Sequence, residues 1–195
     1  GQFIDASQLE MSLQMLAPQI IDFNASGRMV SRIGNRSRIA APQGAYQCSG
    51  EDQWCAIAVE TDEDWTNLRS AMCNPTWAND DRFSTTEGRL SRHDEIDGGI
   101  SQWTADKSPQ DVMEILQVAG VPAGVVQRSS DLMRDPQLKH RKFFRELEHS
   151  EVGNVPYTGH QFRIKGYDNG PRFAAPMLGE HNAFVLRDLL GMTDD

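Results

Sequence analysis

The sequence predicts an α/β fold whose centre, residues 44–135, is a small α/β or α+β domain. Short strand-like runs and helical patterns both lie inside this range, between turns rich in glycine and polar residues. An apolar helix precedes the range, and a segment of alternating apolar and polar residues follows it. Neither flank is long enough to bury its own apolar face, so both are expected to pack against something else.

The first predicted element is a helix within residues 5–27. Asp5 or Ser7 can cap its start, and Gly27 can end it. Its apolar residues recur at helical spacing: Leu9, Leu13, Leu16 and Ile20. Pro18 lies inside this pattern and removes a backbone hydrogen bond, which predicts either a kink or a division into two helices.

Residues 28–43 are predicted to be a basic, extended linker. This segment shows no sustained hydrophobic period and contains Arg28, Arg32, Arg36 and Arg38. Two interpretations of the arginines remain open. Their guanidinium groups can hold phosphates by bidentate hydrogen bonds, or they can pair with the acidic residues that the chain has in excess.

The central domain is predicted to begin with a β-hairpin. Its two strand-like runs are Ala45 to Cys48 and Trp54 to Val59. The polar turn "SGEDQ" between them is typical of a hairpin with a longer loop.

Helical patterns then cover residues 62–72, 84–105 and 108–120. The last helix has Ser108 as its cap, Pro109 as its first residue and Gly120 as its stop: "SPQDVMEILQVAG". Within the second pattern, "DGG" at Asp97 to Gly99 predicts an interruption of the helix, since glycine disfavours helical backbone.

The remaining elements are shorter. "VPAGVVQ" is predicted to be a buried strand, and "SSDLMRDPQLKHRKF" a short helix that breaks before Pro136. After Phe144, alternating residues with Gly and Pro turns predict two or three strands with irregular connections. A final amphipathic helix has an apolar face made of Phe184, Val185, Leu189 and Leu190.

Composition and charge exclude several classes of partner. A formal net charge of −9 argues against binding to double-stranded nucleic acid, because neutralising phosphates requires a concentrated basic face. No apolar stretch reaches the roughly 18–20 residues that span a membrane, and the amino terminus lacks the pattern of a signal peptide. We therefore expect a cytoplasmic protein with no nucleic-acid partner and no membrane partner.

The common catalytic and metal-binding motifs are absent from the sequence. Cys48, Cys55 and Cys73 have neither disulfide-framework nor zinc spacing, and the five histidines lie in no metal motif. A GxSxG elbow, a GxGxxG turn after a strand and a P-loop are all missing. The acidic run "ETDEDW" is interpreted as a helix start capped by Thr61 or Asp62 rather than as a metal loop.

Seven runs occur in order along almost the whole chain: "GQFIDASQLEMSL", "GRMVSRIGNRSRIAAPQGAYQCSGEDQWCAIAVETDEDW", "DDRFSTTEGRLSRHDEID", "AGVPAGVV", "DPQL", "FFRELEHSEVGNVPYTGHQFRI" and "APMLGEH". In this order and spacing they resemble the C-terminal half of the family III CoA-transferases. That family includes the formyl-CoA, L-carnitine and bile-acid-inducible CoA-transferases, with the α-methylacyl-CoA racemases as relatives.

The resemblance implies a Rossmann-like large domain built from both ends of the polypeptide, with a small domain between them. Two protomers are then expected to thread through each other as interlocked rings, giving a homodimer or a larger assembly. The implied parts are a large-domain helix, an outgoing linker, the small domain, and a return linker with the closing segment of the large domain: residues 1–27, 28–43, 44–135 and 136–195.

The resemblance also implies transfer of CoA from an acyl-CoA to a carboxylic acid through an aspartyl intermediate. The family's catalytic aspartate precedes the segment that "GQFIDAS" resembles, so no catalytic residue is expected in this chain. Asp5 and Asp135 have structural explanations, in a helix start and in a turn before proline. Coenzyme A and acyl-CoA are expected as substrates, without a covalently bound cofactor or a metal. The isolated chain is expected to be inactive without the N-terminal half of the enzyme or a second protomer.

The segment "AAPQGAY", Ala40 to Tyr46, resembles the loop that is glycine-rich in formyl-CoA transferases and closes over the reacting thioester. Such a loop can exclude water and donate backbone N–H groups to an oxyanion. Here it keeps a single glycine. The candidate substrate and CoA-loop residues are Gly44, Tyr46, Gln43, Asn35 and Arg36. "APMLGEH" is interpreted as a structural turn, with Gly179 permitting the turn and Glu180 favouring a helix start.

Two alternatives remain beside the transferase hypothesis. The chain can be a non-catalytic truncated product or separately encoded subunit that only associates. It can also be a relative of the α-methylacyl-CoA racemases, whose acid and base would lie outside this chain as well. The run "GNRSRIAAPQGAYQCSGEDQW" looks more like the transferases.

Overall fold

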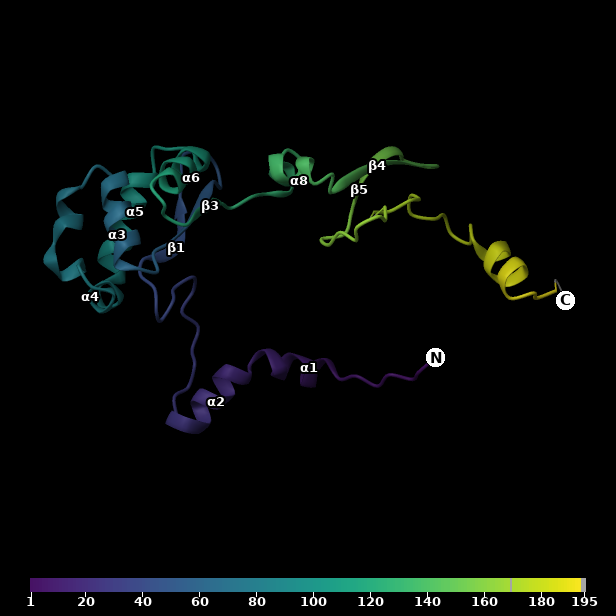
Figure 1. The fold of residues 1–195 in the computed structure, drawn as a ribbon, viewed down its shortest axis with the longest axis horizontal. Helices are drawn as coiled ribbons and strands as arrows, with labels where there is room; N and C mark the ends of the chain where they lie inside the picture. The colour runs from purple at the N-terminus through teal and green to yellow at the C-terminus, as the bar shows by residue number, and fades with distance from the viewer. Residues whose placement is uncertain (169, 194–195) are drawn as a thin grey trace. The chain divides into compact units, whose positions relative to one another are not determined.

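The computed structural model describes residues 1–168 and 170–193. The chain divides into two compact units, Gly1–Val126 and Gln127–Asp195. In Figure 1 the first unit runs from purple to teal and the second from green to yellow. The assignment of residues 1–27 and 136–195 to a larger domain stays a prediction.

The first unit begins with two consecutive helices, α1 (Gln8–Met15) and α2 (Ala17–Ser26). Ser7 caps α1 by accepting a hydrogen bond from the backbone N–H of Glu10, and Gly27 ends α2 in the left-handed conformation. The chain divides at Leu16, and Pro18 lies in the first turn of α2, where proline is tolerated. The predicted division is therefore confirmed. Neither helix contains a buried residue.

A three-stranded antiparallel sheet forms the centre of this unit, with strand order β1-β2-β3. The strands are β1 (Gln43–Gln47), β2 (Trp54–Ala58) and β3 (Ala123–Val125). The hairpin expected from the sequence is confirmed, because Tyr46 pairs with Cys55 and Gln47 with Trp54. The strand pairing also brings the run "VPAGVVQ" against β2.

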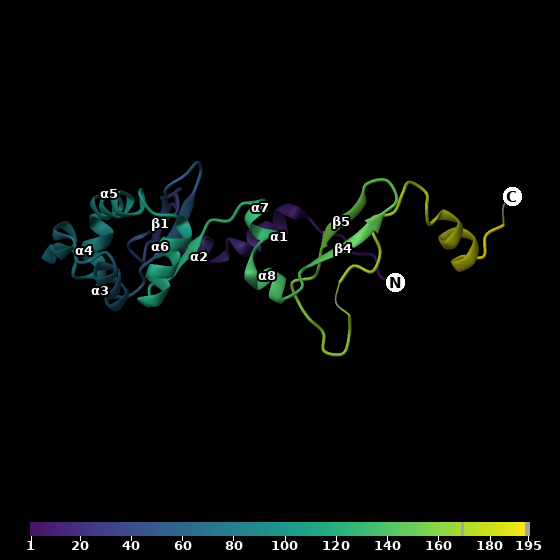
Figure 2. The same cartoon turned by 90° about the horizontal axis from the view of Figure 1, so that it is seen from above.

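Helices cover one face of this sheet (Figure 2). They are α3 (Asp62–Ala71), α4 (Thr86–Ser91), α5 (His93–Thr104) and α6 (Pro109–Val118), with 3-10 turns η1 (Thr76–Asn79) and η2 (Asp81–Phe83) between α3 and α4. Tyr46, Cys55 and Ile57 alternate along their strands with exposed or half-buried residues, so they share the covered face. Together with apolar residues of α3, α5 and α6 they form one hydrophobic core.

Helix starts in this unit follow the sequence closely. Thr61 and Asp64 form a capping box at the start of α3, so the acidic run "ETDEDW" is a helix cap, as predicted. Ser108 caps α6, Pro109 is its first residue, and Gly120 follows it with φ +81°.

The predicted interruption at Asp97 to Gly99 is wrong, because α5 runs through these residues without a break. The helical pattern is instead interrupted at Arg92, between α4 and α5. A Cβ atom on Gly99 would lie 2.4 Å from the ring of Trp77. Gly99 is therefore explained by a close approach of the helix to an aromatic ring, which overrides the low helix propensity of glycine.

A buried arginine ties α4 to the segment that enters the sheet. The guanidinium of Arg89 donates to the backbone carbonyls of Ala41 (2.7 Å) and Phe83 (3.1 Å) and to the carboxylate of Asp62 (2.8 Å). It also lies 5.6 Å from the ring centre of Trp65. These contacts satisfy a charge that would otherwise be costly to bury, and they fix the chain just before β1.

The second unit contains short helices and a separate hairpin. Its elements are α7 (Ser129–Leu132), α8 (Pro136–His140), β4 (Phe144–His149), β5 (Gly153–Thr158) and η3 (Phe184–Leu189). The break before Pro136 is confirmed, and β4 and β5 pair antiparallel as two of the predicted two or three strands (Figure 2). The final helix is a π-helix whose apolar side chains are exposed.

The described residues contain no helix that is long and apolar enough to cross a membrane. They also contain no group of three or more His, Cys, Asp or Glu side chains placed to hold a metal ion. Cys48, Cys55 and Cys73 are free thiols, and the first two are buried. Burial raises the pKa of the Cys55 thiol to about 11, so this cysteine is a neutral core residue at physiological pH.

Candidate substrate-binding site

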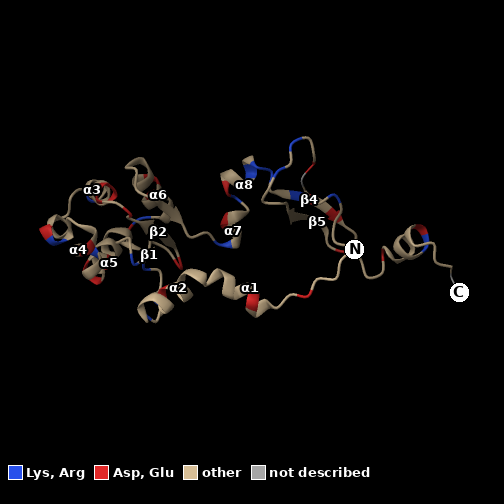
Figure 3. Cartoon of the chain, turned by 60° about the horizontal axis from the view of Figure 1, so that its bottom comes forward, with Lys and Arg blue, Asp and Glu red and all other residues tan. Residues whose placement is uncertain are grey.

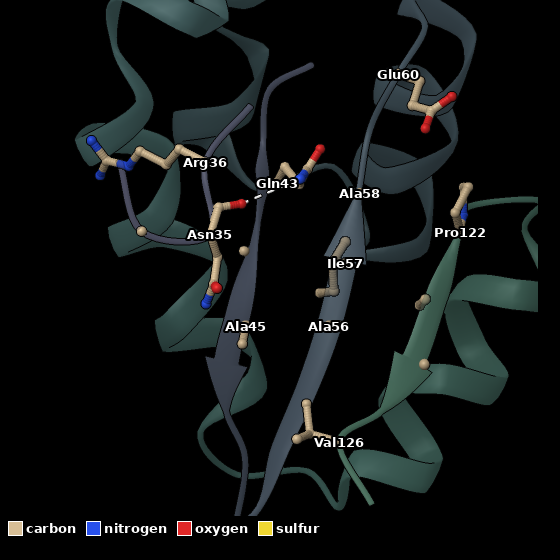
Figure 4. A pocket seen from close by; sticks show the side chains of 14 residues that line it. Asn35, Arg36, Gln43, Ala45, Ala56, Ile57, Ala58, Glu60, Pro122 and Val126 are labelled. Atoms are coloured by element: carbon tan, nitrogen blue, oxygen red, sulfur yellow. Dashed lines mark hydrogen bonds between the residues drawn. The ribbon is translucent and has the colours of Figure 1, made fainter. Parts of the chain in front are cut away.

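The face of the sheet that the helices leave uncovered carries an open pocket of 830 Å³ (Figure 4). Its floor is made of small residues from all three strands. Ala45 pairs with Ala56, and Ala56 pairs with Gly124, so a row of small residues crosses the sheet. Because these side chains extend little above the backbone, the pocket can hold an elongated molecule against the sheet.

The rim of the pocket is more polar than its floor. It is formed by the linker, by the start of β1 and by the ends of β2 and β3, including Asn35, Arg36, Gln43, Glu60, Pro122 and Val126. Glu60 contributes the one carboxylate among the fourteen lining residues, and no cysteine, serine or aspartate lines the pocket. The described residues around this pocket can therefore bind and shield a ligand, and among them Glu60 is the one side chain that could act as a nucleophile or a base.

A hydrogen-bonded network behind β1 holds the rim in place, and its centre is Asp97 on α5. Asp97 accepts from the hydroxyl of Tyr46 at 2.8 Å and from the guanidinium of Arg36 at 2.9 Å. Arg36 also donates to Asp94, one turn earlier on the same helix. The charged linker residue is thereby fixed to α5 at two points.

The same network reaches the first residue of β1. The backbone N–H of Gln43 donates to Nε2 of His93 (3.2 Å), which itself lies 3.6 Å from Oδ1 of Asp97. The side-chain amide of Gln43 donates to the backbone carbonyl of Asn35 at 3.3 Å, as the dashed line in Figure 4 shows. Gln43 thus joins the linker, the strand and α5 at one point.

Burial and neighbouring charges set the protonation states in this network. Burial lowers the pKa of His93, and Asp97 opposes this effect. A neutral His93 agrees with its role as acceptor for the Gln43 N–H. Burial, reinforced by Asp97, raises the pKa of Tyr46, so its hydroxyl is a fixed hydrogen-bond donor rather than a proton-transfer group at neutral pH. The hydrogen bond from Arg36 lowers the pKa of Asp94.

The structure brings four of the five predicted site residues to the pocket: Asn35, Arg36, Gln43 and Gly44. Tyr46 is not among the lining residues. Its side chain lies on the covered face and is 3% exposed. A Cβ atom on Gly44 would be 3.2 Å from the Tyr46 hydroxyl, so the ring leans against this glycine from behind. Tyr46 therefore supports the pocket through Asp97 and does not face a ligand in it.

The segment that resembles a glycine-rich lid is well packed in this chain. Ala40 and Ala41 are buried, and from Gln43 onward the segment belongs to β1. Gly44 has an ordinary strand conformation, since no positive φ is found there. In this structure the segment is a fixed edge of the pocket.

Sequence reasoning missed the network residues on α5 and the small residues of β2 and β3. His93 and Asp97 are four residues apart and therefore share one helix face, a spacing that the sequence displays. Asp97 and its partner Arg36 lie about sixty residues apart in the sequence, a contact that no local pattern reveals. For the linker arginines, the structure shows ion pairs of Arg28 with Asp22 and of Arg36 with Asp94 and Asp97, in agreement with the pairing interpretation.

A family model named CoA-transferase family III matches residues 1–182. The chain belongs to CoA-transferase family III. The family resemblance of the seven sequence runs is thus confirmed, and the described pocket and network are features of a family III chain.

Curated relatives of this family III chain are CoA-transferases. It is 31% identical over its whole length to the "Probable CoA-transferase Rv1866" of Mycobacterium tuberculosis, and covers 24% of that protein. It is 28% identical over its whole length to the succinyl-CoA–D-citramalate CoA-transferase of Chloroflexus aurantiacus, and covers 48% of it. A formyl-CoA:oxalate CoA-transferase of Rhodopseudomonas palustris is 30% identical over 86% of the chain, which covers 40% of that protein.

Solved structures also contain this fold. A CAIB/BAIF family protein from Brucella suis superimposes with a TM-score of 0.82 at 27% identity, over 97% of this chain and 48% of the other. The predicted combination of helices with short antiparallel strands is confirmed by this similarity. The family III chain spans half or less of the length of each relative named here.

Proposed function

We propose that this chain is the C-terminal portion of a CoA-transferase that moves CoA from an acyl-CoA to a carboxylic acid. The observation that carries the proposal is the pocket on the open sheet face, in a family III chain, lined by binding groups but by no aspartate. The relatives it matches are about twice as long or longer. The aspartate that forms the acyl anhydride and then the aspartyl-CoA thioester is accordingly assigned to residues outside this chain.

In this proposal the pocket holds the thioester end of the substrate against the sheet. Ala45, Ala56 and Gly124 let the ligand lie close to the backbone, and Gly44 and Gln43 form its edge beside the linker. Covering the reacting thioester with this surface excludes water, which would otherwise hydrolyse an acyl anhydride. Asn35 and Arg36 lie on the rim, where Asp97 orients Arg36.

The proposed partner of this chain is the N-terminal half of the enzyme, in the same or a second protomer. Helices α1 and α2 display exposed apolar side chains, among them Leu9, Met15 and Ile21. Large exposed apolar surfaces of this kind mark protein interfaces. We therefore assign α1 and α2 to the large domain, and the interlocked dimer is the assembly that this assignment predicts.

The alternative function is that of a subunit that associates and has no catalytic role. It is favoured by the same observation, that no aspartate lines the pocket. The hydrophobic core formed by residues between Tyr46 and Val121 would let such a subunit fold without taking part in catalysis. The relatives named above are transferases, which favours transfer over racemisation as the activity of the completed enzyme.

Recombination of the two halves distinguishes the transferase from the passive subunit. The purified chain is mixed with the N-terminal half, and acyl transfer and hydroxylamine-sensitive acyl-enzyme are measured. The expected result is transfer by the complex and none by either half. A well-folded complex that forms no hydroxylamine-sensitive species would contradict the transferase proposal and support the passive subunit.

A pair of variants tests the assignment of the pocket. Ala56→Trp fills the pocket floor at an exposed position and is expected to abolish transfer while the complex still forms. Gln47→Trp places the same side chain at an exposed position of β1 outside the lining, and is expected to keep transfer. Equal activities of the two variants would show that the pocket does not hold the substrate.

A further inference from the structure

A second pocket, of 310 Å³, lies in the unit Gln127–Asp195 and is strongly basic. It is formed by the end of α8, the start of β4 and the segment after β5, and is lined by His140, Arg141, Lys142, Phe143, Arg145, His160, Arg163, Tyr167 and Asp168. Four of these side chains are cationic and one is an acid, in a protein whose formal charge is −9. Figure 3 shows the basic residues in blue along these elements.

The one carboxylate among the lining residues, Asp168, already forms an ion pair with Arg145. Asp168 accepts two hydrogen bonds from Arg145, one of them 2.9 Å long, in a bidentate pair. The hydrogen bond from Arg145 lowers the pKa of Asp168, so the pair is fully ionised at neutral pH. The positive charges of Arg141, Lys142 and Arg163 therefore remain without a carboxylate among the lining residues. Their mutual repulsion favours an anion in the space between them.

Two of these arginines are held in position by backbone contacts. Arg141 donates from Nη2 to the carbonyl of Gln161 at 3.3 Å, and Arg163 donates from Nη2 to the carbonyl of Arg141. Each contact engages one nitrogen of a guanidinium that has five N–H donors. The planar groups are thus oriented, while further donors are left for a ligand with several oxygen atoms.

Lys142, which lines the basic pocket, has a backbone conformation that is unusual for its residue type. It follows α8 with φ +52°, in the left-handed region where a glycine or asparagine is usual at the end of a helix. A lysine in this conformation is disfavoured by its own Cβ atom. Glycine would suit this backbone better, and the lysine instead adds a cation to the pocket.

A larger hollow with a mixed apolar and charged lining adjoins the basic pocket. It has a volume of 560 Å³, shares Lys142 and Arg145 with the basic pocket, and is otherwise lined by Met133, Leu138, Lys139, Phe144 and Glu146. The two hollows together offer a place for a charged group beside the apolar side chains of Met133, Leu138 and Phe144.

We propose that the pocket around Lys142, Arg141 and Arg163 binds a phosphate group, with the adjoining hollow receiving the organic part of a phosphorylated ligand against Met133, Leu138 and Phe144. A phosphate dianion presents several acceptor oxygens in a compact group, which matches converging guanidinium and ammonium donors. The phosphate can be inorganic or carried by an organic molecule. Phosphate binding at this site is measured without turnover, so its failure can be distinguished from a failure of the proposed transferase activity.

Calorimetric titration of the full chain tests the proposal with three probes at low ionic strength. Inorganic pyrophosphate represents the free anion. Adenosine 3′,5′-bisphosphate represents an organic molecule that carries phosphate groups, and adenosine is the same molecule without them. Both phosphate probes are expected to bind and adenosine is not. Tighter binding of the bisphosphate than of pyrophosphate assigns the site to an organic phosphate, and the reverse order assigns it to the free anion. Failure of both phosphate probes to bind would overturn the proposal.

Three variants tie binding to the pocket. Lys142→Gly is expected to keep or raise Tm, since glycine suits the left-handed backbone, and to weaken phosphate binding roughly tenfold through loss of one charged donor. Lys165→Gln removes one charge from the same segment but not from the pocket lining, and is expected to leave binding unchanged. Asp168→Asn removes the one lining carboxylate and is expected to tighten binding. Equal weakening by Lys142→Gly and Lys165→Gln would show that only overall charge matters and would overturn the site.

Discussion

Asp97 is the residue that connects the pocket rim to the core of the first unit. It accepts a hydrogen bond from the buried hydroxyl of Tyr46 and another from Arg36 of the linker. Asp94 lies on the same helix and also accepts a hydrogen bond from Arg36, but its side chain is 88% exposed. The two aspartates therefore share a partner and differ in burial, which makes them a matched pair for mutagenesis.

Asp97→Ala is expected to destabilise the chain by about 1–3 kcal/mol, because the Tyr46 hydroxyl is left buried without its acceptor. Asp94→Ala is expected to have no measurable effect on stability, since water replaces its exposed interaction. Urea unfolding followed by tryptophan fluorescence measures both. If the two variants unfold at the same urea concentration, Asp97 does not have the central role described here.

His93 gives the first unit a dependence of stability on pH. Burial lowers its pKa in the folded chain, with Asp97 and Asp94 opposing this and Arg36 adding to it. As the pH falls below about 6.5, the usual histidine value, the unfolded chain takes up a proton that the folded chain resists. The contribution of neutral His93 to the free energy of unfolding is therefore complete above about pH 6.5. It is lost as the pH falls from that value towards the pKa of His93 in the folded chain.

The expected observation is a falling urea midpoint between pH 7 and pH 5 for the unmodified chain. His93→Gln, which keeps a polar side chain at the position, is expected to reduce this slope. The carboxylates whose pKa values are lowered in the fold, such as Asp62, act at more acidic pH and do not account for it. An unchanged slope in His93→Gln would mean that the folded histidine titrates normally.

At the scale of elements, α5 contains two adjacent glycines with opposite surroundings. A Cβ atom on Gly99 would lie 2.4 Å from the ring of Trp77, whereas no atom lies within 4 Å of the corresponding position on Gly98. Helix propensity favours alanine over glycine equally at both positions, so packing alone separates them.

Gly98→Ala is expected to stabilise the chain by about 0.5–1 kcal/mol, through the lower backbone entropy of the unfolded state. Gly99→Ala is expected to destabilise it by about 1–3 kcal/mol, because Trp77 or the helix must move to admit the methyl group. Thermal unfolding monitored by circular dichroism measures both changes. Stabilisation by both substitutions would show that α5 does not approach Trp77 as closely as described.

The boundaries of a helix can be predicted from the sequence when the residues that fix them are close neighbours along the chain. The caps Ser7, Thr61 and Ser108 accept hydrogen bonds from backbone groups three residues away, so sequence contains the whole interaction. Gly99 was misinterpreted because its partner, Trp77, lies in a different element. A glycine in a helical pattern has the same sequence signature whether it breaks the helix or admits a ring.

At the scale of the whole molecule, apolar side chains are exposed at both ends of the chain. They include Leu9, Met15 and Ile21 in α1 and α2, and Phe184 and Leu189 in η3. Single exposed apolar residues are ordinary, but two consecutive helices without a buried residue form an apolar surface of the kind that protein interfaces use.

The isolated chain is therefore expected to self-associate through α1 and α2. The double variant Leu9→Gln, Ile21→Gln is expected to shift the chain towards monomer in sedimentation velocity, because it removes apolar surface that association would bury. Val118→Gln serves as the control, since Val118 is 91% exposed but lies on α6. This prediction would be contradicted if the unmodified chain were strictly monomeric at high concentration.

The sequence by itself determined the family, the helix caps, the hairpin and four of the residues around the pocket, since these depend on order along the chain and on contacts between near neighbours. Only the tertiary structure decided that Tyr46 lies behind the sheet, that Asp97 links it to Arg36, and that Arg141, Lys142 and Arg163 converge. These arrangements join residues distant in sequence, and their geometry depends on how strands, helices and loops pack. A pattern of residue types specifies which faces are buried, but the pairing of particular side chains across those faces is fixed by packing.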